Sequence, residues 1–197
     1  MITVVVQSYL GMYKRAAKDR NRKIVRAINS ILAQTVKVEA MIVADGCNKT
    51  AQIIKEKFAG RVTGYIIPKQ QVWSGVPRNL GIEKARYDTI CYLDIDDYLE
   101  KTHCERILDN FGKSDWIWFD DMVFSKGTWR TRRCDIDKKG MCGTSNLAHK
   151  KYKIWPDKGG YAHDWLAIRN LKQASDNYRY IGHGGYRVCH IPGRIDI

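Results

Sequence analysis

Short apolar runs alternate with segments of helical period through the first half of the chain, and this alternation limits the fold more than any other feature. The runs with the length and residue types of strands are residues 2–6, 39–44, 62–67 and 89–95. After the first run, Ile24, Ile28 and Leu32 recur at the spacing of one helix face. Strands separated by helices are typical of parallel sheets with crossover connections, so the sequence predicts an open α/β sheet.

The second half of the chain is less regular. It predicts a hairpin from residues 116–124 and 128–133 around Lys126 and Gly127, a helix over 160–171 and a late strand over 186–191. The length of 197 residues fits one domain with a sizeable core. We therefore expect a single α/β domain with a mostly parallel, twisted sheet flanked by helices, and a small antiparallel element toward the C-terminus.

Acidic residues follow two of the predicted strands. Asp45 closes one run, and Asp94, Asp96 and Asp97 close another. Ligands of open α/β sheets bind beyond the carboxyl ends of the strands. Residues two apart in extended chain point to one side, so Asp94 and Asp96 can face one hard cation such as Mg²⁺ or Mn²⁺. We expect Asp97 instead to cap the next helix together with Glu100.

Six segments in order, VVVQSY, AINSILAQT, MIVADG, PRNLGIEKA, YLDIDDYL and AHDW, resemble the motifs of family 2 glycosyltransferases with the GT-A fold. The resemblance covers residues 2–100 and, more loosely, 140–170. It implies an inverting enzyme that uses a nucleotide-sugar donor, with a UDP-sugar favoured, and holds Mn²⁺ or Mg²⁺ at the DxD aspartates. Residues 1–112 would then be the nucleotide-sugar-binding half of one GT-A domain, and residues 113–197 the acceptor-binding half.

The resemblance also implies roles for single residues. Asp164 matches the catalytic base, although on its own an aspartate there reads more simply as a helix N-terminal residue. Asp94 and Asp96 match the metal-binding pair, and His190 or His183 could complete the metal shell, an ordinary hydrogen-bonded His being the commoner role. The nucleotide-sugar-binding residues would be Gln7, Tyr9, Asp45, Arg78, Asn79, Asp94 and Ile95. Candidates to stack on a sugar or base, unless simply buried, are Trp73, Trp129, Trp155 and Trp165.

The chain departs from the family pattern at three places. The first strand ends in Gln7-Ser8-Tyr9 where Pro-Thr-Tyr-Asn is usual, so its contact to the base of the nucleotide is expected to differ. His163 precedes Asp164 where an acidic residue is often found. The stretch between Tyr9 and Ile24 is longer than expected and strongly basic.

Two segments carry the whole excess of positive charge. The formal net charge is +13; residues 13–26 hold seven Lys or Arg against one Asp, and residues 126–153 hold nine against two. If the first segment is helical, a spacing of four makes one basic stripe of Lys14, Lys18, Arg22 and Arg26. This distribution predicts attraction to polyanions. The alternative is that the two segments are merely solvated faces.

The acceptor is therefore expected to be polyanionic, and a hydroxylated base in DNA is one specific form of it. A lipid-linked saccharide or surface polysaccharide is the alternative acceptor. A non-catalytic nucleic-acid-binding protein on an α/β scaffold is the alternative from another class.

The cysteines and the hydropathy suggest a compartment. The six cysteines form no CxxC pair, so we expect free thiols in a reducing environment. No apolar run reaches the length of about 18 residues that a membrane-spanning helix needs, so we expect a soluble, cytoplasmic protein. The sequence does not indicate the oligomeric state.

Overall fold

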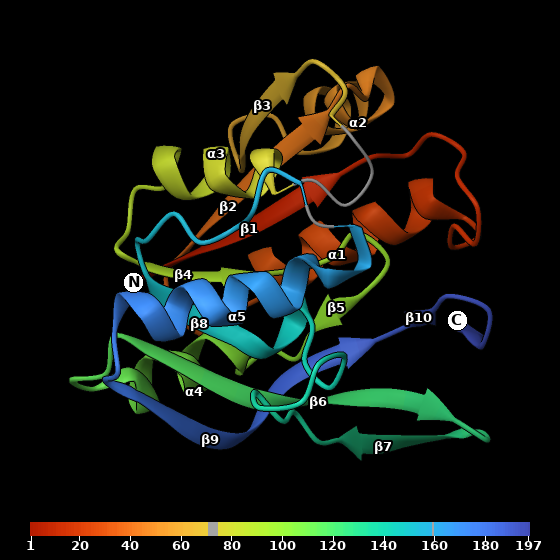
Figure 1. The fold of residues 1–197 in the computed structure, drawn as a ribbon. Coiled ribbons are helices and arrows are strands. Elements are labelled where there is room, and N and C mark those ends of the chain that lie inside the picture. The colour runs from red at the N-terminus through yellow and green to blue at the C-terminus, as the bar shows by residue number, and fades with distance from the viewer. Residues whose placement is uncertain (71–74, 159) are drawn as a thin grey trace.

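One twisted sheet runs through the whole molecule (Figure 1). The computed structural model describes residues 1–70, 75–158 and 160–197. The strand order of the sheet is β3-β2-β1-β4-β8-β6-β9-β5, and β7 pairs with β6 outside this path. The predicted open α/β sheet is confirmed.

The first half of the chain forms the parallel part of the sheet. Its strands are β1 (Ile2–Ser8), β2 (Val38–Asp45), β3 (Thr63–Ile67) and β4 (Thr89–Tyr92), with β1 between β2 and β4. The helices between them are α1 (Arg20–Leu32), α2 (Asn48–Lys57) and α3 (Val76–Lys84). Because β1 and β2 are buried apolar runs covered on both faces, they occupy the interior of the sheet.

The second half adds antiparallel pairs. Its elements are β5 (Tyr98–Leu99), α4 (His103–Phe111), β6 (Trp116–Ser125), β7 (Thr128–Arg132), η1 (Thr144–Asn146), β8 (Leu147–Lys150), η2 (Gly160–Ala162), α5 (His163–Ala174) and β9 (Tyr178–Val188). Strand β8 pairs antiparallel with both β4 and β6 and so joins the two halves. The C-terminal hairpin of β10 (His190–Ile191) and β11 (Ile195–Asp196) is the expected small antiparallel element.

The predicted hairpin is confirmed, because β6 and β7 pair antiparallel about a two-residue turn. Lys126 and Gly127 have φ values of 51° and 78°, the left-handed conformation that a tight hairpin turn needs. The helix predicted over 160–171 is confirmed as α5 with a preceding 3₁₀ turn. The late strand begins at Tyr178 instead of residue 186, because β9 also pairs in parallel with β6.

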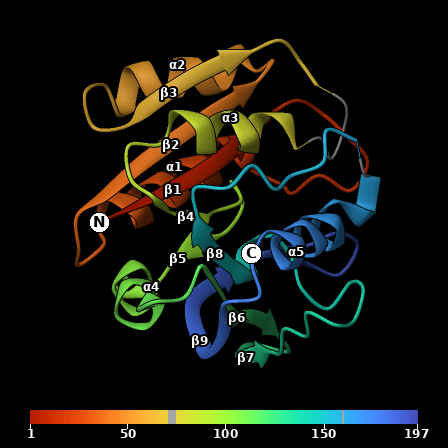
Figure 2. The ribbon, with the colours of Figure 1, turned by 60° about the vertical axis from the view of Figure 1, so that its left-hand side comes forward.

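The helices cover the two faces of the sheet in separate groups. Helices α1, α2 and α4 pack on one face, where residues such as Ile24, Ile28 and Ile107 meet the side chains of β1 and β6. Helices α3 and α5 cover the other face through residues such as Ile82 and Leu171. Figures 1 and 2 show α3 and α5 on the same side of the sheet. Each fully buried aliphatic side chain contributes roughly 1.5–3 kcal/mol, so these two cores fix the helices on the sheet.

The basic stripe expected over residues 13–26 does not form. Helix α1 begins only at Arg20, after Asp19 with a left-handed φ of 48°. Lys14 and Lys18 therefore lie before the helix. Arg26 turns inward and donates to the backbone oxygen of Asp96 at 2.7 Å.

Two local expectations are wrong. Cys134 and Cys142 form a disulfide, so free thiols remain only at the buried Cys47, Cys91, Cys104 and Cys189. Asp97 does not cap a helix, because α4 begins later, at His103. Among the described residues, no helix combines the length and the apolar character that crossing a membrane requires.

Candidate active site

A cavity of about 330 Å³ opens where β1, β2 and β4 end. Residues of the second half close its other side, among them Thr144 and Asp164. The sequence-predicted residues that line it are Gln7, Tyr9, Asp45, Arg78, Asp94, Ile95, Asp96, Asp164 and His190. Residues far apart in the sequence, such as Gln7 and Asp164, therefore share one space.

Asn79, Trp129 and Trp155 are not among the residues that line the cavity. The Asn79 amide donates to the backbone oxygen of Trp155 at 2.8 Å and accepts from its N–H at 3.1 Å. Asn79 thus fixes the segment around Trp155, and the Arg78 guanidinium lies over the Trp155 ring at 4.7 Å from its centroid. Trp129 packs against Tyr98 and Phe124 instead of lining the cavity. Trp73 lies outside the described residues.

Asp45 is held rigidly at the end of β2. Its carboxylate, 1% exposed, accepts from Lys69 Nζ at 2.8 Å and from the backbone N–H of Gln70 at 2.7 Å. Lys69 also lies over the Tyr9 ring. A Cβ at Gly46, whose φ is 63°, would come within 2.5 Å of the Lys69 side chain, so only glycine lets this segment approach.

Three carboxylates crowd the turn after β4. Strand β4 ends at Tyr92, so Asp94, Asp96 and Asp97 follow the strand, and the Asp97 N–H donates to the Asp94 carbonyl at 3.2 Å. Asp94 lies 3.3 Å from Arg78 Nη2. Burial, and after it the charge of Asp94, raises the pKa of Asp96 to about 6. The two DxD carboxylates therefore repel each other in one space.

Asp97 is a buried structural anchor for the C-terminal region. Its carboxylate accepts from the Cys189 N–H at 2.6 Å and from the Tyr186 hydroxyl at 3.0 Å. Burial, followed by the charges of Asp96 and Asp94, raises the pKa of Asp97 above its ordinary value. The Tyr186 hydroxyl also lies 3.0 Å from the backbone N–H of Asp94, so one tyrosine ties β9 to the acidic turn.

The donor chemistry of the acidic turn fits a hard cation. Asp94 and Asp96 both line the cavity, and no Lys or Arg among the described residues forms an ion pair with Asp96. Hard divalent cations take such carboxylate oxygens and complete their shell with water or phosphate oxygens. In the described part of the chain, no group of three or more His, Cys, Asp or Glu is arranged to hold a metal.

The two candidate histidines lie in different surroundings. His190 lines the cavity, but its Nε2 is 3.0 Å from the Arg15 carbonyl and its Nδ1 faces Asp196 at 3.8 Å. Burial lowers the pKa of His190. His183 lies outside the cavity, 3.6 Å from Glu100.

Asp164 stands in the first turn of α5 with its carboxylate directed by neighbours. It accepts from the Thr144 hydroxyl at 2.8 Å and from His163 Nε2 at 3.1 Å. Burial alone would raise its pKa, but the hydrogen bond and charge of His163, the charge of Arg78 and the Thr144 hydroxyl lower the pKa of Asp164 below its ordinary value. It is therefore ionised at neutral pH and can accept a proton.

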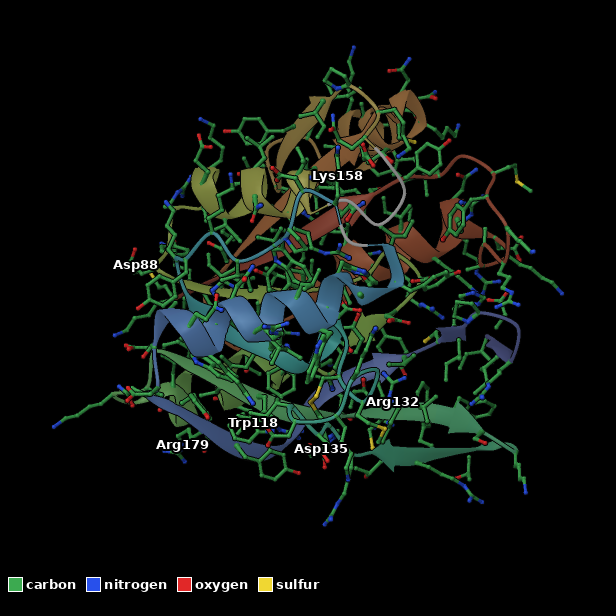
Figure 3. The ribbon with its side chains drawn as sticks, viewed as in Figure 1. Asp88, Trp118, Arg132, Asp135, Lys158 and Arg179 are labelled. Atoms are coloured by element: carbon green, nitrogen blue, oxygen red, sulfur yellow. A yellow bond between two sulfur atoms is a disulfide. The ribbon has the colours of Figure 1, made fainter. Side chains whose placement is uncertain are left out.

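Several lining residues were missed from the sequence, among them Lys69, Thr144 and Arg132. Arg132, labelled in Figure 3, ends β7. It donates through Nε at 2.9 Å and Nη2 at 2.5 Å to Asp121, which is fully buried. The sequence did contain a pattern from which the pair of Asp121 and Arg132 could have been predicted. The hairpin about Lys126 and Gly127 places residue 121 opposite residue 132, so the register alone brings the two charges together.

The family model for glycosyl transferase family 2 matches residues 16–163. The chain belongs to this family. It is 33% identical over 112 residues to the putative glycosyltransferase EpsH of Bacillus subtilis, covering 55% of this chain and 33% of EpsH. It is 33% identical over 101 residues to the poly(ribitol-phosphate) β-N-acetylglucosaminyltransferase TarP of Staphylococcus aureus, covering 48% of this chain and 30% of TarP. The chain thus spans about a third of the length of these relatives.

Solved structures confirm the GT-A-type fold. The structure of Staphylococcus aureus TarS 1–349 in complex with UDP-GlcNAc is similar with a TM-score of 0.73 at 15% identity, over 98% of this chain and 60% of that chain. The complex of the same TarS fragment with UDP has a TM-score of 0.69 at 15% identity, over 95% of this chain and 60% of that chain.

Proposed function

We propose that this protein transfers a sugar from a nucleotide-sugar to an acceptor hydroxyl with inversion at the anomeric carbon. The observation that carries the proposal is that Asp94 and Asp96 of the first half line the same cavity as Asp164 of the second. Family membership supports the reaction class. The TarS complexes with UDP-GlcNAc and UDP support a UDP-sugar as the donor.

Residues 1–112 would hold the donor. Gln7, Tyr9 and Asp45 line the end of the cavity formed by β1 and β2, where the nucleoside would lie. Asp94 and Asp96 would hold Mn²⁺ or Mg²⁺, which when bound neutralises charge on the departing diphosphate. Arg78, fixed against the Trp155 ring, would stabilise the same developing charge from the protein side.

Asp164 would act as the base. Its carboxylate accepts the proton of the acceptor hydroxyl while that oxygen bonds to the anomeric carbon. The bond from this carbon to the diphosphate breaks in the same step, and its electron pair leaves with the diphosphate. Because attack comes from the face opposite the leaving group, the product is inverted.

We infer that the acceptor is polyanionic and most closely matches a saccharide or polyol chain with phosphodiester links. The positive charge of the two basic segments supports an anionic acceptor. TarP, a relative, is named for transfer to poly(ribitol-phosphate). A hydroxylated base in DNA is the second candidate, which charge alone supports.

The test of this proposal is hydrolysis of UDP-sugars in the presence of Mn²⁺ without acceptor, together with thermal shift on donor binding. Asp94→Ala is expected to lower hydrolysis by roughly 100-fold, because it removes a group that organises the diphosphate. The control is Asp88→Ala, an exposed aspartate away from the cavity (Figure 3). Equal hydrolysis by both variants, or no donor binding by the unchanged protein, contradicts the proposal.

A further inference from the structure

A second hollow adjoins the cavity of the candidate active site. The two share Arg132 and Ile191 as lining residues. The second hollow lies between the tip of the β6–β7 hairpin and the C-terminal β10–β11 hairpin, and its lining residues are Val123, Phe124, Ser125, Lys126, Arg132, Ile191, Arg194, Ile195 and Asp196. We name this second hollow the outer groove. The two hollows therefore meet at Arg132 and Ile191.

The outer groove carries cations without acidic partners. Lys126 and Arg194 are exposed, and within the described residues neither forms an ion pair. Asp196 is the one acid among the lining residues described. Its carboxylate is already engaged by the Lys18 N–H at 2.7 Å and by Lys23. Unpaired like charges repel one another, and an arriving anion relieves that repulsion.

Arg132 is built to serve the junction of the two hollows. Two of its five N–H groups are used by Asp121, which fixes the plane of the guanidinium. No described residue accepts a hydrogen bond from the remaining N–H groups, and a planar guanidinium suits phosphate oxygens. Since Ser145 also donates to Asp121 at 3.0 Å, the support of Arg132 is buried and does not depend on ligand.

We propose that the outer groove binds the acceptor as an anionic chain with phosphodiester links, one phosphate at Arg132 and further phosphates at Lys126 and Arg194. This inference rests on the proposed function, because it assumes that an acceptor hydroxyl reaches Asp164. Apolar side chains that line the groove with the cations, such as Phe124 and Ile195, would contact the carbon atoms between successive phosphates.

A double-stranded nucleic acid fits these observations less well. Some cations of the second basic segment are already neutralised within the protein. Lys138 pairs with Asp135 at 3.1 Å, and Lys150 pairs with Asp115. The outer groove lies between two hairpins, and this setting favours a single chain over a duplex.

The experiment measures binding of a fluorescein-labelled ribitol-phosphate octamer by anisotropy. The variant is Lys126→Asn with Arg194→Gln; asparagine is chosen because it tolerates the left-handed φ of 51° at position 126. The double variant is expected to bind roughly tenfold more weakly, because two charge contacts to phosphate are lost. The matched control, Lys55→Gln on the exposed side of α2, should stay within about twofold.

Three results overturn the inference: equal binding by the double variant and the control, equal binding of a neutral dextran oligomer, or tighter binding of an oligonucleotide duplex than of the octamer. Hydrolysis of a UDP-sugar by the same samples reports the donor site separately. If the unchanged protein does not hydrolyse any UDP-sugar, the proposed function fails. If it does, but the octamer binds the double variant and the control alike, only the groove assignment fails.

Discussion

The two halves of the chain hold their charged side chains in different ways. In residues 1–112 two of the cavity acids have cationic partners, Asp45 with Lys69 at 2.8 Å and Asp94 with Arg78 at 3.3 Å. In residues 113–197 the groove cations Lys126 and Arg194 form no ion pair with a described residue. Paired groups keep their geometry before a ligand arrives, whereas unpaired cations gain most from the arrival of an anion.

The backbone of the two halves is also held in different ways. Parallel strands with short crossovers set the first half of the cavity, and their geometry follows from burial of both sheet faces. Hairpins, a 3₁₀ turn and the disulfide of Cys134 and Cys142 set the second half. The first half of the cavity is therefore set by regular sheet geometry, whereas the second half also depends on individual tethers such as the disulfide.

The largest effect is expected from Asp164→Asn. Asp164 is the proposed base and belongs to the second half of the chain. Loss of the general base is expected to lower the rate constant of transfer by roughly 1,000-fold, with the KM for donor nearly unchanged. Steady-state transfer assays measure both. Asp176→Asn, an exposed aspartate after α5, is the control. An Asp164→Asn enzyme with a tenth of the normal rate would remove Asp164 from the reaction.

The disulfide of Cys134 and Cys142 is a covalent tether of the second half, and its removal tests how much stability this tether contributes. Replacing Cys134 and Cys142 by alanine is expected to lower the free energy of unfolding by about 2.5 kcal/mol, because a loop of this length gains chain entropy when opened. Urea denaturation measures the change. The control is internal: reductant should shift the unfolding midpoint of the unchanged protein and leave that of the double variant where it is. A midpoint insensitive to reductant in both proteins contradicts the expectation.

Substitutions at Gly184, in the second half, and at Gly64, in the first, allow the packing of the two halves to be compared. A Cβ at Gly184, on β9, would overlap the buried ring of Phe119. Gly184→Ala should therefore lower the free energy of unfolding by about 2 kcal/mol. A Cβ at Gly64, on the edge strand β3, meets only Ile54 at 3.3 Å, so Gly64→Ala should change stability by less than about 0.5 kcal/mol. Urea denaturation of both variants checks the contrast, and equal losses would mean that Gly184 is not a packing constraint.

What the sequence could predict follows the same division. The parallel strands and the acids at their ends were predictable, because apolar period and strand-end position are local signals. The insertion of β8 between β4 and β6 was not, since it pairs segments far apart in the chain. The wrong expectation for Asp97 has the same cause, because its partner Cys189 lies 92 residues away. No local pattern encodes such a contact.

The smallest expected effect concerns His163, where the family motif usually has an acid. Its hydrogen bond and charge lower the pKa of Asp164, with smaller help from Arg78 and Thr144. His163→Gln keeps a hydrogen-bond donor but removes the charge, so the pKa of Asp164 should rise. Because the base works only as a carboxylate, the acid limb of the pH profile of the transfer rate should move to higher pH.

The rate at neutral pH then tells positioning from electrostatics. With the base still ionised at pH 7 to 8, His163→Gln should slow transfer there by less than about threefold. Thr144→Val removes a hydrogen bond to Asp164 without changing charge, so its acid limb should move less than that of His163→Gln. A purely structural role for His163 would instead lower the rate by one factor at every pH and leave the limb in place. That result would assign the low pKa of Asp164 to Arg78, a residue of the first half, and so make the base depend on the preorganised side of the cavity.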